Sequence, residues 1–159
     1  MNVSIICVGK IKEKFYKDAV AEYLKRLSKF CKTEIIEVDD EDTPQNASKT
    51  VEDKIKDKEG ERIISRIPDN AYVYTLEIEG KKYDSVSFSK EISERQLSGD
   101  SKIVFIIGGS LGLSDKVKSI SKGKISFSDM TFPHQLMRVI LLEQIYRAFK
   151  IINNEPYHK

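Results

Sequence analysis

The residues best suited to binding a ligand follow three short apolar segments. The glycine-rich run Gly108–Gly112 comes directly after the apolar residues Ile103–Ile107, and the segments Leu76–Gly80 and Phe127–Phe132 lie at the ends of two other predicted strands. In open α/β sheets, ligands bind beyond the carboxyl ends of the strands, and glycines let the backbone approach another group closely. We therefore expect one pocket in which these three loops present backbone donors and acceptors.

The glycine-rich run lacks the patterns of the common phosphate-binding loops. No Gly-Lys-Ser or Gly-Lys-Thr follows it, and it does not read G-x-G-x-x-G. Phosphate binding by this loop is therefore disfavoured, and a neutral or cationic ligand held by backbone groups stays open. The two histidines, His134 and His158, have no paired spacing, and no Cys-x-x-Cys occurs, so a metal site is not supported. No G-x-S-x-G elbow indicates a serine hydrolase.

The last seven residues carry side chains that could act on a substrate. The segment NNEPYHK presents a phenol at Tyr157, an imidazole at His158 and an amine at the final lysine. Pro156 prevents the preceding helix from continuing. Such a tail is usually frayed, but this one could also fold back over the Phe127–Phe132 loop and close the pocket.

The tail follows a long apolar helix, predicted for residues 133–152. Pro133 would occupy the first helical position, where its missing N–H is tolerated. Apolar side chains nearly encircle the helix; because one sheet face cannot bury them all, we expect a homodimer through this helix. His134 is interpreted as a neutral residue that caps the helix and fixes the preceding loop. One polar stripe, either solvated or facing a cleft, runs along Glu143, Arg147 and Lys150.

The remaining elements alternate between strands and helices. Period and turn signals predict strands over residues 2–8, 33–38, 71–78, 103–107 and 124–128, and helices over 12–30, 48–66, 85–97 and 114–120. Ser48 is a good N-cap for the second of these helices. The alternation predicts an α/β fold with a mainly parallel sheet and helices on both faces. We expect a single domain spanning residues 1–159.

The composition is that of an ordinary soluble domain, with 40% hydrophobic and 33% charged residues. No apolar segment reaches membrane-spanning length. Cys7 and Cys31 are the only cysteines; we interpret both as core residues and take a reducing cytoplasm as the location. Between Lys10 and Lys32 there are eight Lys or Arg residues against three acids. This segment is either a solvated helix face or a surface that contacts phosphates.

Several segments together resemble the bacterial ribosomal large-subunit pseudouridine N3-methyltransferases of the SPOUT superfamily. They are the opening VSIICVGKIKEKFY, the GGSLGL loop, the block ISFSDMTFPHQLMRVILLEQIYRAFKI and the Pro-Tyr-His-Lys ending. The resemblance covers the whole chain, with one departure at Asn154, where some members have glycine. It implies that the C-terminal segment forms a deep trefoil knot. That knot would bring the three loops together as an S-adenosylmethionine site.

The resemblance also implies a substrate, partners and residue roles. The protein would act as a homodimer, without a metal, on N3 of a pseudouridine in a 23S rRNA stem-loop (the helix 69 region) of the ribosome. His158 would accept the N3 proton, with Glu143 the next candidate, and Tyr157 would stack on the target base. Arg138, Arg147 or Lys159 would stabilise the imide oxyanion. Carried over by motif position, the cofactor contacts would be Leu76, Gly108, Phe127, Ser128, Asp129, Met130, Thr131 and Phe132.

Two other functions stay open at this point. A tRNA methyltransferase of the same superfamily would share the fold and the cofactor. A non-enzymatic module that binds RNA or the ribosome would share the fold alone. The tail argues against the binding module, because binding by itself requires no Tyr-His pair beside a cofactor loop.

Overall fold

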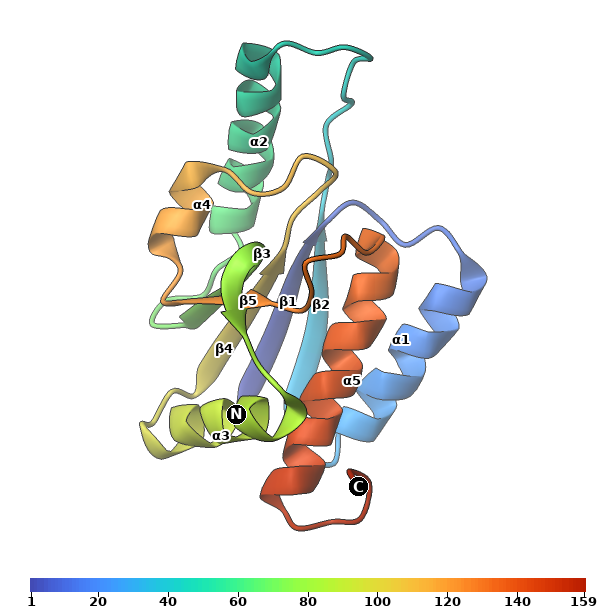
Figure 1. Cartoon of the computed structure of the whole chain (residues 1–159), viewed down its shortest axis with the longest axis vertical. Coiled ribbons are helices and arrows are strands. Elements are labelled where there is room, and N and C mark those ends of the chain that lie inside the picture. Colours follow the sequence, from blue (N-terminus) through green and yellow to red (C-terminus); the bar gives the residue numbers. More distant parts are fainter.

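The computed structural model describes residues 1–159 and is built on one five-stranded sheet (Figure 1). The strands are β1 (Asn2–Val8), β2 (Lys32–Val38), β3 (Tyr72–Lys82), β4 (Lys102–Ile107) and β5 (Gly123–Ser126), in the spatial order β2-β1-β4-β3-β5. Every neighbouring pair is parallel. The carboxyl ends of the strands therefore share one edge, where the predicted loops lie.

Helices cover both faces of the sheet, which confirms the predicted α/β fold. One face carries α1 (Lys14–Leu27), α3 (Ser85–Leu97) and α5 (His134–Ile152), and the other carries α2 (Lys49–Ile64) and α4 (Asp115–Ile120) (Figure 1). Most predicted boundaries agree within three residues. Strand β3 runs four residues further than predicted, because it pairs with β5 again after an irregularity beyond Leu76.

Two helix starts test the predicted caps. The Ser48 side chain accepts a hydrogen bond from the Val51 N–H and caps α2, as predicted. Pro133 is the N-cap of α5 rather than its first helical residue, with φ −55° and ψ 139°, and no side chain caps this helix. His134 lies in the first turn, as expected, but the prediction that it is a hydrogen-bonding cap is wrong, because no side chain caps this helix.

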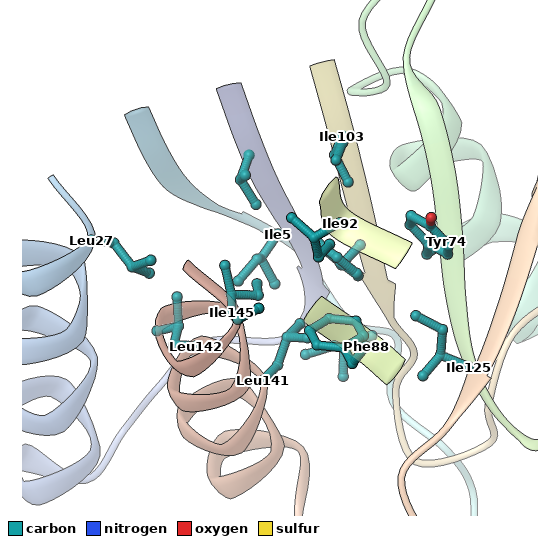
Figure 2. Packing of buried hydrophobic residues seen from close by; sticks show 14 of the residues in the cluster. Ile5, Leu27, Tyr74, Phe88, Ile92, Ile103, Ile125, Leu141, Leu142 and Ile145 are labelled. Atoms are coloured by element: carbon teal, nitrogen blue, oxygen red, sulfur yellow. The ribbon is translucent and has the colours of Figure 1, made fainter. Parts of the chain in front are cut away.

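The larger hydrophobic core lies between the sheet and the helices α1, α3 and α5 (Figure 2). The central strands β1 and β4 are buried along nearly their whole length, as expected for parallel strands covered on both faces. Ile5 and Phe105 form the sheet side of this core, and Leu141 and Ile145 form its α5 side. Packing of α5 on the sheet thus determines where both ends of this helix lie.

Helix α5 lies between α1 and α3, and none of its side chains is fully exposed. The argument that a second subunit must cover its apolar surface is therefore wrong, because α1, α3, the sheet and the C-terminal tail cover most of it within one chain. The homodimer stays a prediction that rests on the family resemblance. None of the helices is both long and apolar enough to cross a membrane.

Both cysteines are buried, as predicted. Burial raises the pKa of the Cys7 thiol to about 12, so this thiol stays protonated at neutral pH. A thiol in that state is a poor nucleophile, and covalent catalysis by Cys7 is disfavoured.

We expect Leu141→Ala to lower the free energy of unfolding by about 2–5 kcal/mol, because Leu141 is 0% exposed and its removal leaves a cavity in the core under α5. Leu97→Ala, at a side chain 85% exposed, should change it by less than about 0.5 kcal/mol. Urea unfolding followed by circular dichroism measures both. Equal midpoints for the two variants would contradict this account of the core.

Candidate active site

A cavity of about 150 Å³ lies where the three predicted loops meet. Its walls come from the middle of β3, where its pairing with β5 is irregular, from the loop after β4 and from the loop between β5 and α5. The lining is mostly apolar, with backbone groups of the glycine-rich loop on one side. The lining residues are Leu76, Glu77, Ile78, Ile107, Gly108, Gly109, Gly112, Leu113, Ile125, Phe127, Ser128, Met130, Thr131, Phe132, His134 and Met137.

Of the residues predicted to contact a cofactor, all but Asp129 line this cavity. The carboxylate of Asp129 faces solvent, and its Oδ2 lies 2.7 Å from Lys82 Nζ. The Asp129 side chain thus points away from the cavity, and whether this residue contacts a cofactor stays a prediction. Whether the other residues bind a cofactor stays a prediction.

The glycine-rich loop is too tight for side chains at the cavity wall. A Cβ on Gly108 would lie 2.9 Å from the backbone carbon of Gly112 and 3.0 Å from Leu113 Cδ2. Gly112 has φ +85°, a conformation that other residues rarely adopt. The Gly112 N–H donates to the Gly109 carbonyl at 3.0 Å and closes the turn. The two glycine positions thus keep the backbone exposed to the cavity.

Sequence reasoning missed Glu77, the one carboxylate in the cavity wall. Its side chain is only 6% exposed, and Oε2 accepts a 2.6 Å hydrogen bond from Thr75 Oγ1. Lys118 Nζ lies 3.6 Å from Oε1. A buried carboxylate with free acceptor capacity can bind a ligand hydroxyl or amine. The available signal was an acid inside the apolar strand sequence YVYTLEIEG.

A second, polar cavity of about 420 Å³ lies beyond the carboxyl ends of β1, β2 and β4 and shares Gly109 and His134 with the first. Burial, followed by the charge of Arg138, lowers the pKa of His134, so its imidazole is neutral at pH 7, as predicted. Burial is also the main cause that raises the pKa of Glu59, a buried acid in the same wall.

Arg138 lies in the wall of this second cavity and not in the first. It is 1% exposed and donates to Glu37 Oε2 at 2.6 Å and to the Gly9 carbonyl at 2.7 Å, while its Nε has no partner. The guanidinium thus joins α5 to the ends of β1 and β2. A residue so engaged can set the local field, and its unpartnered Nε–H is a donor that is still free.

The C-terminal tail is ordered against α5 and is not frayed. The Tyr157 hydroxyl donates to Glu143 Oε1 at 3.1 Å, and the Tyr157 ring packs edge-on against Tyr146 at 5.0 Å. Glu155 pairs with Lys150 at 2.6 Å. Asn154 has φ +53°, a left-handed conformation that asparagine tolerates better than most residues. Glycine adopts this conformation as readily, so the expected departure from glycine at this position leaves the tail conformation unchanged.

The tail occupies the polar side chains that form the stripe along α5. Glu143 accepts hydrogen bonds from Arg147 and Tyr157, and Arg147 NH1 lies 3.3 Å from His158 Nδ1. If Nδ1 accepts from Arg147, the ring proton is on Nε2, and His158 has no free lone pair for a substrate proton. Glu143, saturated with donors, is a poor base in this arrangement. The stripe neither faces solvent nor lines the first cavity, because the tail covers it.

The tail packs on α5 and approaches the Phe127–Phe132 loop only through His158, so its closure over that loop stays a prediction. His158 borders a third cavity, of about 600 Å³, between α3 and α5, which shares Phe127 and Phe132 with the first cavity. Neither His158 nor Tyr157 lines the first cavity itself. The structure thus places the predicted catalytic residues beside the cofactor loop but outside the predicted cofactor pocket. No cluster of three or more His, Cys, Asp or Glu side chains is arranged to hold a metal ion.

Comparison with known proteins gives full-length matches. Residues 1–158 match the family described as "Predicted SPOUT methyltransferase". A protein of Clostridium botulinum (strain Langeland) named ribosomal RNA large subunit methyltransferase H is 60% identical over 159 residues, covering all of both chains. A Methanococcus vannielii protein is equally identical over the same span. The solved structure of a "probable methylase family protein" from Haemophilus influenzae Rd KW20 matches 96% of this chain and 66% of its own, with TM-score 0.51 and 12% identity, which supports the fold alone.

The parallel α/β sheet, with a loop-lined cavity beyond its carboxyl edge, agrees with a methyltransferase fold of this class. The chain belongs to the SPOUT methyltransferase family. Membership confirms the resemblance seen in the sequence and implies the C-terminal trefoil knot, which itself stays a prediction.

We expect Arg138→Ala to lower the free energy of unfolding by about 3 kcal/mol, the lower end for breaking a buried ion pair, because Glu37 is partly exposed. Arg26→Ala removes an exposed pair with Glu22 and should leave the urea midpoint unchanged. If Arg138→Ala retained full stability but lost activity, Arg138 would act on substrate and not as a link between elements.

Proposed function

We propose that this protein transfers a methyl group from S-adenosylmethionine to N3 of a pseudouridine in 23S rRNA, in the helix 69 region, and acts as a homodimer. The single observation that carries the proposal is the loop-lined cavity in a chain that is 60% identical, end to end, to a named ribosomal RNA large subunit methyltransferase. A protein that only binds RNA would not need a small-molecule cavity between these loops.

The first cavity is suited to the adenosine part of the methyl donor. Its walls combine apolar side chains such as Leu76 and Phe132 with backbone groups of Gly108 and Gly109, which suits a flat, aromatic base with polar edges. Glu77, buried in the wall, offers an acceptor for ribose hydroxyls. When bound, the donor supplies the methyl group at its sulfonium centre.

The protein's own contribution is positioning and proton removal. Methyl transfer is an in-line displacement, so holding the acceptor nitrogen in place supplies much of the rate. The N3 proton must also leave, and a general base contributes about 10²–10⁴-fold. His158 is the candidate base once its Nδ1 is released from Arg147, Tyr157 is the stacking surface, and Arg147 is the cation nearest to both. Glu143 would then hold Tyr157 and Arg147 in place.

We further propose that the tail of one subunit acts at the cofactor pocket of the other. Within one chain, His158 and Tyr157 pack on α5 and do not line the first cavity. A second copy of the chain can present the same residues from outside. The proposed homodimer would therefore have a catalytic purpose even though α5 is largely covered within one subunit.

Contacts to the RNA backbone are proposed for the basic segment from Lys10 to Lys32. Lys14 pairs with Asp18 and Arg26 with Glu22, both as exposed pairs on α1. Lys10 and Lys12 lie at the rim of the second cavity, where Lys10 makes only a long, exposed pair with Asp39 at 3.9 Å. These exposed cations can neutralise phosphates, with an affinity that falls as salt rises.

The function is tested by mass spectrometry of ribosomal and transfer RNA from a strain that lacks the gene. We expect one methyl group to disappear from a pseudouridine of 23S rRNA and to return when the gene is restored. Loss of a methyl group from a tRNA instead would favour the related tRNA methyltransferases. Unchanged RNA of both kinds would overturn the proposal.

Gly108→Val should abolish binding of S-adenosylmethionine in calorimetry, because the new side chain would press on Gly112 and Leu113 and fill the cavity. Gly99→Ala is the control: Gly99 also has a positive φ, but it lies at the far end of α3 with no atom near its Cβ position. It should cost stability and leave affinity unchanged. Unchanged affinity in Gly108→Val would show that the loop does not contact the donor.

Mixed dimers test the exchange of tails. A subunit with Gly108→Val keeps its tail, and a subunit truncated after Pro156 keeps its cofactor pocket. Each homodimer should be inactive, whereas the mixed dimer should recover about half of the wild-type activity through its one complete site. A mixed dimer as inactive as its parents would show that each tail serves its own subunit.

A further inference from the structure

The third cavity, between α3 and α5, is the largest of the three, at about 600 Å³. It adjoins the first cavity, because Ile125, Phe127 and Phe132 line both. Its volume falls within the roughly 300–1,000 Å³ of small-molecule sites. A group that accepts a methyl from a donor in the first cavity can be placed here. The apolar part of the wall suits a flat ring, such as a base that is turned out of its RNA stack.

One amide side chain in this wall is held in place but not saturated. Gln144 Oε1 accepts from Ser85 Oγ at 2.9 Å, and Gln144 Nε2 donates to Glu143 Oε2 at 2.9 Å. An amide has two acceptor sites on its oxygen and two N–H groups on its nitrogen, so one of each stays unpaired. Because Ser85 and Glu143 hold both ends of the amide, its orientation is set before a ligand enters.

Two other polar side chains of this wall are already engaged. Asp84 accepts from the Ser87 N–H at 2.6 Å and caps α3, and a carboxylate has no N–H to donate. Ser126 Oγ lies 3.3 Å from the Ser128 carbonyl, to which it donates. Gln144 is the only side chain in the wall that combines an amide oxygen with an amide N–H. It can therefore pair with a ring edge that carries an N–H beside a carbonyl.

Pseudouridine has such an edge, and uridine does not. In pseudouridine the ribose is attached to C5, so N1–H is free and lies next to the C2 carbonyl. An amide side chain can pair with such an edge through two hydrogen bonds, as glutamine does with the edge of adenine. In uridine the ribose is attached to N1. When its N3 is presented in the same way, C5–H takes the place of N1–H, and the amide oxygen faces a carbon.

We propose that Gln144 recognises the free N1–H of the target pseudouridine and thereby distinguishes it from uridine. Gln144 Oε1 accepts from N1–H, and Nε2 donates to the C2 carbonyl. N3, on the other side of C2, is then left free for the donor in the adjoining cavity. Ser85 is a positioning residue, because its hydroxyl holds the amide oxygen. The mixed dimers decide which subunit's tail supplies the base, and Gln144 has the same role in either case.

The inference rests on the proposed function, and two preparations of 70S ribosomes separate them. One comes from a strain that lacks only this methyltransferase, and it carries pseudouridine at the target. The other comes from a strain that also lacks the pseudouridine synthase for that position, and it carries uridine. Transfer of a labelled methyl group by the full-length protein gives kcat/KM for each acceptor, and mass spectrometry confirms the methylated position.

We expect the wild-type protein to favour pseudouridine at least about tenfold in kcat/KM, because with uridine the amide oxygen loses its N–H partner. Gln144→Met keeps the length of the side chain but removes the amide, so it should bring the ratio to about one, with the loss on the pseudouridine acceptor. Gln96→Met, a matched change at an exposed position of α3, should change neither value. Affinity for S-adenosylhomocysteine should stay at the wild-type value, because Gln144 does not line the first cavity.

Ser85→Ala provides a second variant, which keeps the amide and removes only the hydroxyl that holds it. Its ratio should lie between those of wild type and Gln144→Met. Equal kcat/KM for both acceptors in the wild type would overturn the inference, as would an unchanged ratio in Gln144→Met, or in Ser85→Ala if Gln144→Met does not fold. A loss by the same factor on both acceptors would make Gln144 a structural residue. If the wild-type protein methylates neither preparation, the proposed function fails, and the inference fails with it.

Discussion

The packing of α5 against the sheet is the constraint on which the rest of the structure depends. The α5 side chains of Leu141, Leu142 and Ile145 are 0% exposed and form the side of the helix that packs into the core. Burial of apolar surface on this scale is the main favourable term in folding. Because the helix is rigid, this one contact places its first turn between the first two cavities and its last turn beneath the C-terminal tail. A shift of α5 along the sheet would disturb all three places together.

Polar contacts fix the two ends of α5. Apolar packing alone is not directional and would allow the helix to shift along the sheet. Near its start, Arg138 joins α5 to the Gly9 carbonyl and to Glu37, and Gln135 Oε1 accepts from the Lys12 N–H at 3.0 Å. Near its end, Glu143 and Arg147 hold Tyr157 and His158. Directional contacts of this kind specify one arrangement among several that would bury similar area. They explain why charged residues occur in so apolar a helix.

Much of the fold follows from local sequence patterns. Apolar runs such as Ile103–Ile107, bounded by turn residues, predict buried strands, and the alternation with helices predicts a parallel sheet. The three expected segments do meet in one cavity, because strands of a parallel sheet end at a common edge, although the Leu76–Gly80 segment is part of β3 and not a loop. The close packing of the loop after β4 can also be predicted from the sequence, because its glycines mark positions where a side chain would not fit.

The sequence by itself determined the elements, the sheet type and the loops that line the first cavity, because these depend on residues close together in the chain. It could not determine which elements would cover α5, so it overestimated the apolar surface left for a partner. It also could not place Arg138, Glu59 or His158, whose contacts join residues far apart in the chain, such as Arg138 and Glu37. Only the tertiary structure decided that the tail would pack on α5 and that a polar cavity would form between the ends of β1 and β4. Such features arise from the spatial order of the strands, which no local pattern encodes.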